Sequence, residues 1–206
     1  MIKTKASIRP IEKGKNVFII GGANNLNVIN HILNTDWKPL VGKDIKIDKF
    51  YCFEPLKELD EWVQKFNTDK IDAEIEFIKK AMWIEDGEVV FRRMGAHFSS
   101  TLCPDKNNGH FIEAYGVEAI DFSKWLKDNV SKNDFVICDL DIECSEYKIL
   151  PHLIENKTIG LIDYLVIEWH KTKCGTWYAD NEVKLEQDLH NHVKLLDHNG
   201  IGIGEV

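Results

Sequence analysis

The chain has 206 residues, of which 44% are hydrophobic and 29% are charged, proportions that are ordinary for a soluble globular protein. This length favours one folded domain, which we place at residues 16–206, after a polar lead-in or linker at residues 1–15. The net charge of −8 and the scattered basic residues disfavour a nucleic-acid-binding surface.

Targeting signals and cysteine usage indicate the expected compartment. The first residues lack the apolar core of a signal peptide, and no apolar run approaches the roughly 20 residues that span a bilayer. The five cysteines form no C-x-x-C pair, which argues against a disulfide framework or a zinc site. We therefore expect a cytoplasmic protein without a membrane span, in which the cysteines stay reduced.

The first predicted elements are a strand, a glycine-containing turn and a helix. An apolar strand at residues 17–20 meets the turn Gly-Gly-Ala-Asn-Asn at residues 21–25, and apolar residues then recur at helical spacing. A second strand at residues 50–53 ends in Glu54 and Pro55. The apolar spacing after it predicts a helix with Pro55 in its first turn.

The middle of the chain predicts a β-hairpin and a long loop. Residues 75–83 form a third predicted strand, and an Asp-Gly turn at residues 86–87 joins it to a strand at residues 88–93. Residues 95–116 are rich in Gly, Ser, Asn and Pro, and a loop of this length favours a lid over the site. A short strand is predicted at residues 117–120.

The carboxyl-terminal part continues the alternation of strands and helices. We predict a helix that is capped by Asp121 or Ser123 and runs through Val130, followed by an apolar strand from residue 135. A helix from about residue 145, which Pro151 kinks or restarts, leads to a strand at residues 164–169. A helix at residues 181–198 and a strand at residues 201–206 come last. This order predicts an α/β, Rossmann-like fold with a mostly parallel sheet between helices. The hairpin insert makes the predicted sheet mixed.

Ionisable residues follow two of the apolar strands. The strand from residue 135 runs into the carboxylates Asp139, Asp141, Glu143 and Glu146, and the strand at residues 164–169 is followed by His170 and contains Glu168 near its end. We interpret Glu146 as an acid at a helix start. In parallel α/β sheets, ligands bind at the carboxyl ends of the strands, so we expect the functional site there.

The first turn and the second strand predict a nucleoside site. Backbone amides of a glycine-containing turn let a ligand approach closely, and Glu54 at the end of the next strand is placed to bind a ribose diol. The turn is not G-x-G-x-x-G, so a nucleoside without phosphates fits better than a dinucleotide. The alternative is that the glycines make only a tight turn and that Glu54 is an acid at a helix start.

Together these segments resemble the FkbM-type S-adenosylmethionine-dependent methyltransferases over about residues 16–170. The matching segments are Gly22-Ala23-Asn24, Phe53-Glu54-Pro55, Lys80-Ala81, residues 87–91, Ser99-Ser100-Thr101-Leu102, residues 121–126, Asp141-Ile142-Glu143, residues 146–150 and Glu168-Trp169-His170. Their order and spacing carry the resemblance. It implies the class I methyltransferase fold and methylation of hydroxyl groups, often on sugars or polyketides.

The resemblance also implies a set of residues around the cofactor. It puts Gly22, Ala23 and Asn24 along the methionine part, Glu54 on the ribose hydroxyls, Ala81 and Met82 beside the adenine, and Ser99 and Ser100 over the cofactor. Gly21, Pro55 and Asp139 complete the expected cofactor-binding set.

The chain departs from the family pattern at four positions. The family usually has an acid where this chain has Ile20, and a glycine where it has Leu26. A lysine typical of the family is Asp139 here, and the glycine after the Asp-x-Glu element is Cys144. Loss of the first acid bears on cofactor affinity, because that acid organises water and amides around the methionine part.

The acids and the imidazole suggest a mechanism. Holding the acceptor oxygen in line with the sulfonium methyl group supplies up to about 7–11 kcal/mol, and a base adds about 10²–10⁴-fold. Asp139, Asp141 and Glu143 share a face if the strand persists. We predict His170 or Asp141 as the general base and Glu143 as the residue that orients the acceptor, a hydroxyl of a sugar in a glycan or glycoconjugate.

Other interpretations of the same residues stay open. The three alternating carboxylates suit Mg²⁺ or Mn²⁺, but we favour direct binding of acceptor hydroxyls and predict no metal. The element Asp139-Leu140-Asp141 also suits a metal-dependent glycosyltransferase, and Ile20 and Leu26 favour a catalytically degenerate interaction module.

Aromatic residues fall into two groups. We predict Trp83, Trp125 and Trp169 in the core. Trp177 and Tyr178 lie in a polar loop, where they either stack on a sugar ring or pack on the surface.

Overall fold

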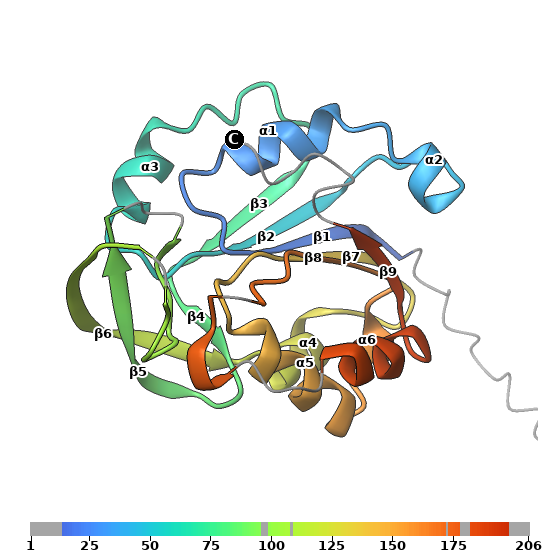
Figure 1. The fold of residues 1–206 in the computed structure, drawn as a ribbon. Coiled ribbons are helices and arrows are strands. Elements are labelled where there is room, and N and C mark those ends of the chain that lie inside the picture. The colour runs from blue at the N-terminus through green and yellow to red at the C-terminus, as the bar shows by residue number, and fades with distance from the viewer. Residues whose placement is uncertain (1–13, 96–98, 108, 172, 178–181, 198–206) are drawn as a thin grey trace, which may run out of the picture.

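The computed structural model describes residues 14–95, 99–107, 109–171, 173–177 and 182–197. Most of the predicted lead-in and the predicted strand at residues 201–206 lie outside these ranges. The described residues form a layered α/β structure with a second, smaller sheet at one end (Figure 1).

The main sheet has six strands in the order β3-β2-β1-β7-β8-β9. They are β1 Asn16–Gly21, β2 Lys49–Phe53, β3 Glu74–Ile78, β7 Phe135–Leu140, β8 Tyr164–Ile167 and β9 Lys194–Asp197. Each neighbouring pair among them is parallel. The strand order reverses beside β1, and open α/β sheets bind ligands at such a switch point. The predicted mostly parallel α/β fold is confirmed at this level.

Helices cover both faces of the main sheet. On one face lie α1 Asn27–Asn34, α2 Lys38–Val41 and α3 Leu59–Lys65, and on the other α4 Phe122–Asn129, α5 Glu146–Glu155 and α6 Glu182–His190 (Figure 1). Short 3₁₀ turns occur at Ile159–Leu161 and Gly175–Trp177. Among the described residues, no helix is long and apolar enough to cross a membrane.

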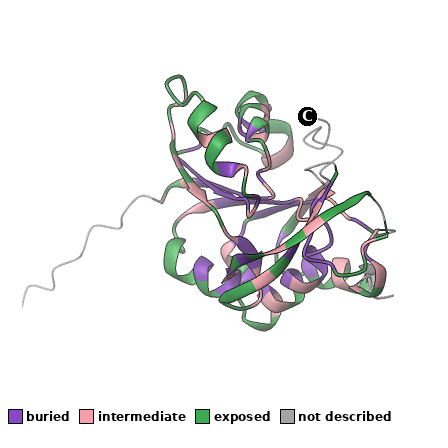
Figure 2. Ribbon diagram, turned by 90° about the vertical axis from the view of Figure 1, so that its left-hand side faces the viewer, coloured by how far each residue is buried: buried purple, intermediate pink, exposed green. Residues whose placement is uncertain are grey.

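The core lies on both sides of the main sheet, whose strands are mostly buried (Figure 2). Successive β1 residues point to opposite faces: Phe18 packs toward α1, and Ile19 packs toward α4 and α5. Burial on both faces explains why the strand sequences are continuous apolar runs. The predicted core position of Trp125 is confirmed, since its ring lies edge-on to Phe53 at 4.9 Å between centroids.

The second sheet corrects the predicted hairpin. It has the order β4-β6-β5, with β4 Ala81–Trp83, β5 Gly87–Met94 and β6 Phe111–Asp121. The predicted strand at residues 75–83 is divided between the two sheets, and β5 pairs antiparallel with β6 instead of with β4. The Asp-Gly turn indicates that the chain reverses direction locally, but it does not indicate that β6 lies between the two strands that it joins, β4 and β5.

Several predicted boundaries also change. The long loop is shorter than predicted, because β6 begins at Phe111. Pro55 lies before α3 rather than in its first turn, and α5 runs through Pro151 without restarting. The predicted helix at residues 181–198 ends at His190 and is followed by β9. The predicted cap is confirmed, since Asp121 Oδ1 accepts a hydrogen bond from the Lys124 amide at 3.1 Å.

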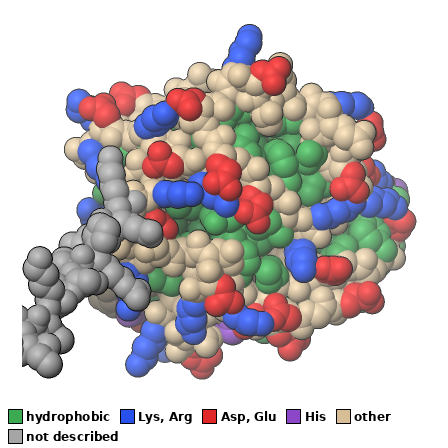
Figure 3. All heavy atoms as spheres, turned by 180° about the vertical axis from the view of Figure 1, so that it is seen from behind, with side chains coloured by type: hydrophobic (Ala, Val, Ile, Leu, Met, Phe, Trp, Pro, Cys, Tyr) green, Lys and Arg blue, Asp and Glu red, His purple; other side chains and the backbone are tan. Residues whose placement is uncertain are grey.

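Charged side chains are interspersed over the face shown in Figure 3. Around the edge strand β3, Lys49 Nζ lies 2.8 Å from Glu74 Oε1 and 2.9 Å from Glu76 Oε2. Such edge charges discourage pairing with a strand of another chain.

Candidate functional site

The cavity that brings the predicted site residues together, and that we call the main cavity for this reason, lies between the carboxyl ends of β1, β2 and β7 and the second sheet. Its walls are Gly22, Asn24, Phe53, Glu54, Pro55, Lys80, Ala81, Met82, Phe91, Ser100, Leu102, Asp141, Ile142, Glu143 and Ser145. It holds about 560 Å³ of free space including its open mouth.

Most of the predicted site residues meet at this cavity. The ones on its wall are Gly22, Asn24, Glu54, Pro55, Ala81, Met82, Ser100, Asp141 and Glu143. The predicted residues Gly21, Ala23, Ser99, Asp139 and His170 lie beside it but are not on the wall. Asp139 is 1% exposed, so only Asp141 of the Asp139-Leu140-Asp141 element faces the cavity.

Backbone hydrogen bonds place the first turn against the end of β2. The Gly22 and Ala23 amides both donate to the Phe53 carbonyl at 3.0 Å. The Asp141 amide donates to the Gly21 carbonyl at 3.1 Å, which brings the acid after β7 to the same turn. The three strand ends therefore form one wall.

Glu54 is held in place by two backbone amides. Its Oε2 accepts from the Asn24 amide at 2.8 Å and its Oε1 from the Leu56 amide at 2.9 Å. Burial raises the pKa of Glu54 to about 7, although both amides act to lower it. A carboxylate has about four acceptor sites, so each oxygen can still accept from a ligand hydroxyl. A buried carboxylate fixed beside a cavity is suited to bind a diol.

Two of the positions where the resemblance would expect glycine have a left-handed backbone. Leu26, at the start of α1, has a φ of 70°, and Cys144 has a φ of 85°. Side chains other than glycine cost about 1–2 kcal/mol in this conformation. Both residues are fully buried, so side-chain packing offsets part of that cost. The structure thus gives a physical reason why glycine suits these two positions.

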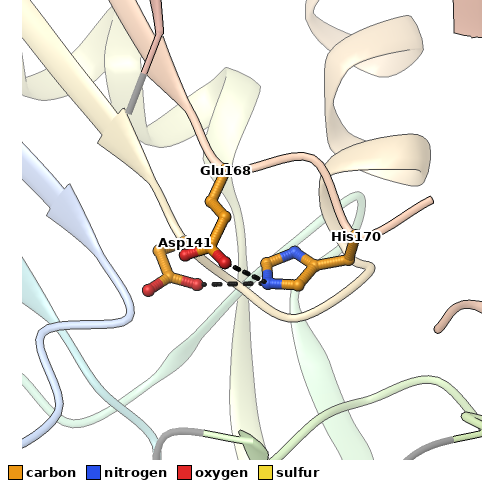
Figure 4. Close-up of side chains that lie close together, drawn as sticks. All are labelled: Asp141, Glu168 and His170. Atoms are coloured by element: carbon orange, nitrogen blue, oxygen red, sulfur yellow. Dashed lines mark ion pairs between the residues drawn. The ribbon is translucent and has the colours of Figure 1, made fainter. Parts of the chain in front are cut away.

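A buried histidine lies among four carboxylates beside the cavity, and Figure 4 shows it with two of them, Asp141 and Glu168. His170 Nδ1 lies 2.8 Å from Glu146 Oε1, so Glu146 contacts the imidazole as well as starting α5. His170 Nε2 lies 3.5 Å from an oxygen of each of Asp141, Glu143 and Glu168. The His170 side chain is 1% exposed and that of Asp141 is 31% exposed. Of His170 and Asp141, Asp141 is therefore the residue whose side chain reaches the cavity.

Two members of the cluster, His170 and Asp141, have a shifted pKa. Burial lowers the pKa of His170, but the hydrogen bond with Glu146 and the neighbouring carboxylates outweigh it and raise the pKa above its ordinary value. Burial, followed by the charges of Glu168 and Glu143, raises the pKa of Asp141 well above its usual range. The acids therefore crowd one another at this edge of the sheet.

Lys106 is a site residue that sequence reasoning missed. Its side chain is 2% exposed, and its Nζ lies 2.5 Å from Glu143 Oε2 and donates to the Ser99 carbonyl at 2.6 Å. The loop after β5 is thereby joined to the acid cluster. A single lysine in a polar loop gives no sequence signal of burial.

Cys144 and Cys174 form a disulfide with a Cα–Cα distance of 5.3 Å, which corrects the expectation that all cysteines are reduced. It joins the turn after β7 to the loop after β8. Cys52, Cys103 and Cys138 are free and buried. Sequence spacing tests only local pairs, whereas neighbouring parallel strands bring cysteines together that are 30 residues apart.

Reduction of this disulfide is expected to destabilise the fold by about 3–4 kcal/mol, the chain-entropy value for a loop of this length. Urea unfolding with and without a phosphine reductant measures the change, and Cys144→Ser should abolish the response to reductant. An equal response to reductant in Cys144→Ser contradicts the assignment.

Trp177 packs against another aromatic residue. Its ring stacks on Trp83 with centroids 5.3 Å apart and planes 25° apart, and Lys148 Nζ lies 5.5 Å from the Trp177 centroid. Surface packing therefore accounts for one ring face. Tyr178, the other residue predicted to stack on a sugar, lies outside the described residues.

Comparison with known proteins adds no relative. No protein-family model, curated protein or solved structure matches the chain. The functional argument therefore rests on the residues and their geometry.

Proposed function

We propose that the chain binds S-adenosylmethionine in the main cavity and transfers its methyl group to a hydroxyl, on a sugar of a glycan or glycoconjugate. The observation that carries this proposal is Glu54, a buried carboxylate that two amides fix at the end of β2, on the wall of the cavity. In doubly wound folds an acid at this place binds ribose hydroxyls.

The rest of the cavity wall suits the other parts of this cofactor. Near Glu54, apolar side chains offer a surface for the adenine; these are Phe53, Ala81, Met82, Phe91 and Leu102. Gly22 lets the first turn lie directly against the segment after β7, since an added Cβ would meet the Asp141 carbonyl oxygen, and its backbone forms part of the cavity wall. No phosphate-binding turn is needed for this ligand.

Polar groups on the cavity wall support a hydroxyl acceptor. These groups belong to Asp141, Glu143 and Ser145. The acceptor oxygen forms a bond to the methyl carbon while the carbon–sulfur bond breaks, so that the sulfonium becomes a neutral thioether. The hydroxyl proton passes to the acid cluster, whose most exposed candidate base is Asp141. His170 lies behind Asp141 and acts as a positioning residue.

Calorimetric titration with S-adenosylhomocysteine tests the cofactor site, and Glu54→Gln is expected to weaken binding at least about tenfold, the loss of one to two charge-assisted hydrogen bonds. Because the pKa of Glu54 is raised to about 7, its carboxylate becomes populated as pH rises through 7. The diol donates to the carboxylate, so affinity should rise about tenfold from pH 6 to pH 8.

The Glu54→Gln variant should lose that pH dependence, whereas the exposed Glu155→Gln control should keep both the affinity and its pH profile. No binding at millimolar S-adenosylhomocysteine, or an unchanged pH profile in Glu54→Gln, counts against the proposal. Titration with UDP-glucose and Mn²⁺ in parallel separates the methyltransferase proposal from a glycosyltransferase.

A further inference from the structure

Three side chains at the ends of two neighbouring strands converge on one point. Asp141 directly follows β7, and Glu168 and His170 follow β8. Each offers one ligand atom, and these atoms all lie within 4.8 Å of one another. Figure 4 shows the two carboxylates directed toward the same imidazole nitrogen.

The buried imidazole supplies a second, independent observation. Glu146 accepts the hydrogen of Nδ1, and in a neutral ring this leaves the lone pair on Nε2. Nε2 is buried and makes no hydrogen bond. It points instead at carboxylate oxygens 3.5 Å away. A lone pair that faces carboxylates is repelled unless a cation lies between them, and in a protonated ring an N–H at this distance is too far for a normal hydrogen bond.

The separations between these atoms suit a bound ion. Two ligand atoms bonded to a metal at about 2.1 Å lie about 3.4 Å apart at a tetrahedral angle. The observed 3.5 Å between Nε2 and each of Asp141 Oδ1 and Glu168 Oε1 is close to that value. Glu146 completes the arrangement, because histidine ligands usually donate their other ring N–H to a carboxylate, which orients the ring.

We propose that Asp141, Glu168 and His170 bind a divalent transition-metal cation through one oxygen each of the acids and Nε2 of the imidazole. The imidazole ligand favours Zn²⁺, Co²⁺ or Mn²⁺ over Mg²⁺ or Ca²⁺. Glu143 is not a ligand, because Lys106 already holds it. The site differs from the alternating element Asp139-Leu140-Asp141, since its ligands come from two strands.

The ion site itself is independent of the proposed function, but the role of the ion in the reaction rests on that function. Asp141 also lines the cavity, so an ion held by its carboxylate would lie at the cavity wall, beside the proposed place of the acceptor. A hydroxyl bound there loses its proton more readily, since metal coordination lowers the pKa of a bound oxygen. The cation would then supply much of the activation that a general base supplies in its absence.

Direct titration with Co²⁺, without S-adenosylhomocysteine, tests the site through the visible absorption of the bound ion, with Zn²⁺ and Mg²⁺ as competitors. One ion should bind per chain, and Zn²⁺ should displace it more effectively than Mg²⁺. Glu168→Gln and Asp141→Asn should each weaken binding at least about 100-fold, since even the loss of a ligand's hydrogen-bonding partner costs about 10–100-fold. Melting temperatures establish that both variants fold.

Two further variants sharpen the result. The exposed Glu155→Gln should keep the affinity within about threefold, and Glu143→Gln should weaken binding less than Glu168→Gln does, because it removes a neighbouring charge but no ligand. Absence of a Co²⁺ spectrum at millimolar metal overturns the site, as does equal weakening in Glu143→Gln and Glu168→Gln, which indicates diffuse attraction to acids. If no ion binds but S-adenosylhomocysteine does, the ion site is excluded and the proposed function stands. If the ion binds but S-adenosylhomocysteine does not, the proposed function is excluded and the ion site stands.

Discussion

Asp141→Asn is expected to lower the rate of methyl transfer at least about 100-fold, while the affinity for S-adenosylhomocysteine stays within about threefold. The side chain of Asp141 is the most exposed of the residues facing His170 Nε2 and lies on the cavity wall. The amide keeps the shape of the side chain but can neither take a proton nor ligate a cation well. Because Glu54 and the apolar part of the wall make the proposed cofactor contacts, cofactor affinity should change little.

Transfer of radiolabelled methyl from S-adenosylmethionine to a panel of monosaccharides and methyl glycosides provides the measurement. Asp188→Asn, which makes the same change at an exposed position on α6, is the matched control and should retain the native rate. A native rate in Asp141→Asn excludes Asp141 from the chemistry. Transfer to none of the sugars, with cofactor binding intact, excludes the sugar acceptors of the panel.

The main sheet could be predicted because its strands carry strong local signals. The apolar runs that became β1, β2, β7 and β8 are continuous, as burial on both faces requires. Glu54 and Asp141 follow such strands, and a parallel sheet brings the carboxyl ends of its strands to one edge. The convergence of these acids with Gly22 on one cavity could therefore be predicted without a structure.

The second sheet could not be predicted in the same way. Residues 75–83 form one apolar stretch in the sequence, but the chain leaves the main sheet after Ile78, where the Lys80 amide bonds the Ile78 carbonyl. The partner of β5 is β6, which begins at Phe111, and no local pattern identifies a partner across an intervening loop. At the other end of the chain, the buried Leu189 and Val193 fit one helical period although α6 ends between them.

Long-range contacts also account for the missed parts of the site. Lys106 reaches Glu143 across 37 positions, and Glu146 meets His170 across 24. Cys144 and Cys174 likewise come from separate loops. The Glu146–His170 contact and the disulfide exist because β7 and β8 are neighbours, whereas Lys106 reaches Glu143 from the loop after β5. All three pairs follow from the tertiary arrangement rather than from spacing in the sequence.

Gly22→Ala is expected to destabilise the fold by about 3–5 kcal/mol, as the sum of a left-handed backbone and a steric clash. Gly22 has a φ of +82°, and an added Cβ would lie 1.9 Å from the Asp141 carbonyl oxygen. The Asp141 carbonyl cannot easily move away, because hydrogen bonds fix both segments: the Asp141 amide donates to the Gly21 carbonyl, and the Gly22 amide donates to the Phe53 carbonyl. Unfolding in urea measures the stability, and calorimetry should show that the folded variant has lost most of its affinity for S-adenosylhomocysteine.

Gly42→Ala separates the two causes. Gly42 has nearly the same backbone conformation, with a φ of +79°, but an added Cβ there meets nothing within 4 Å. It should cost only about 1–2 kcal/mol and leave the cofactor affinity unchanged. The difference between the variants therefore measures how closely the first turn approaches the acid after β7. Equal losses in the two variants would mean that this approach is looser than described, and that Glu54 and Asp141 do not share one rigid wall.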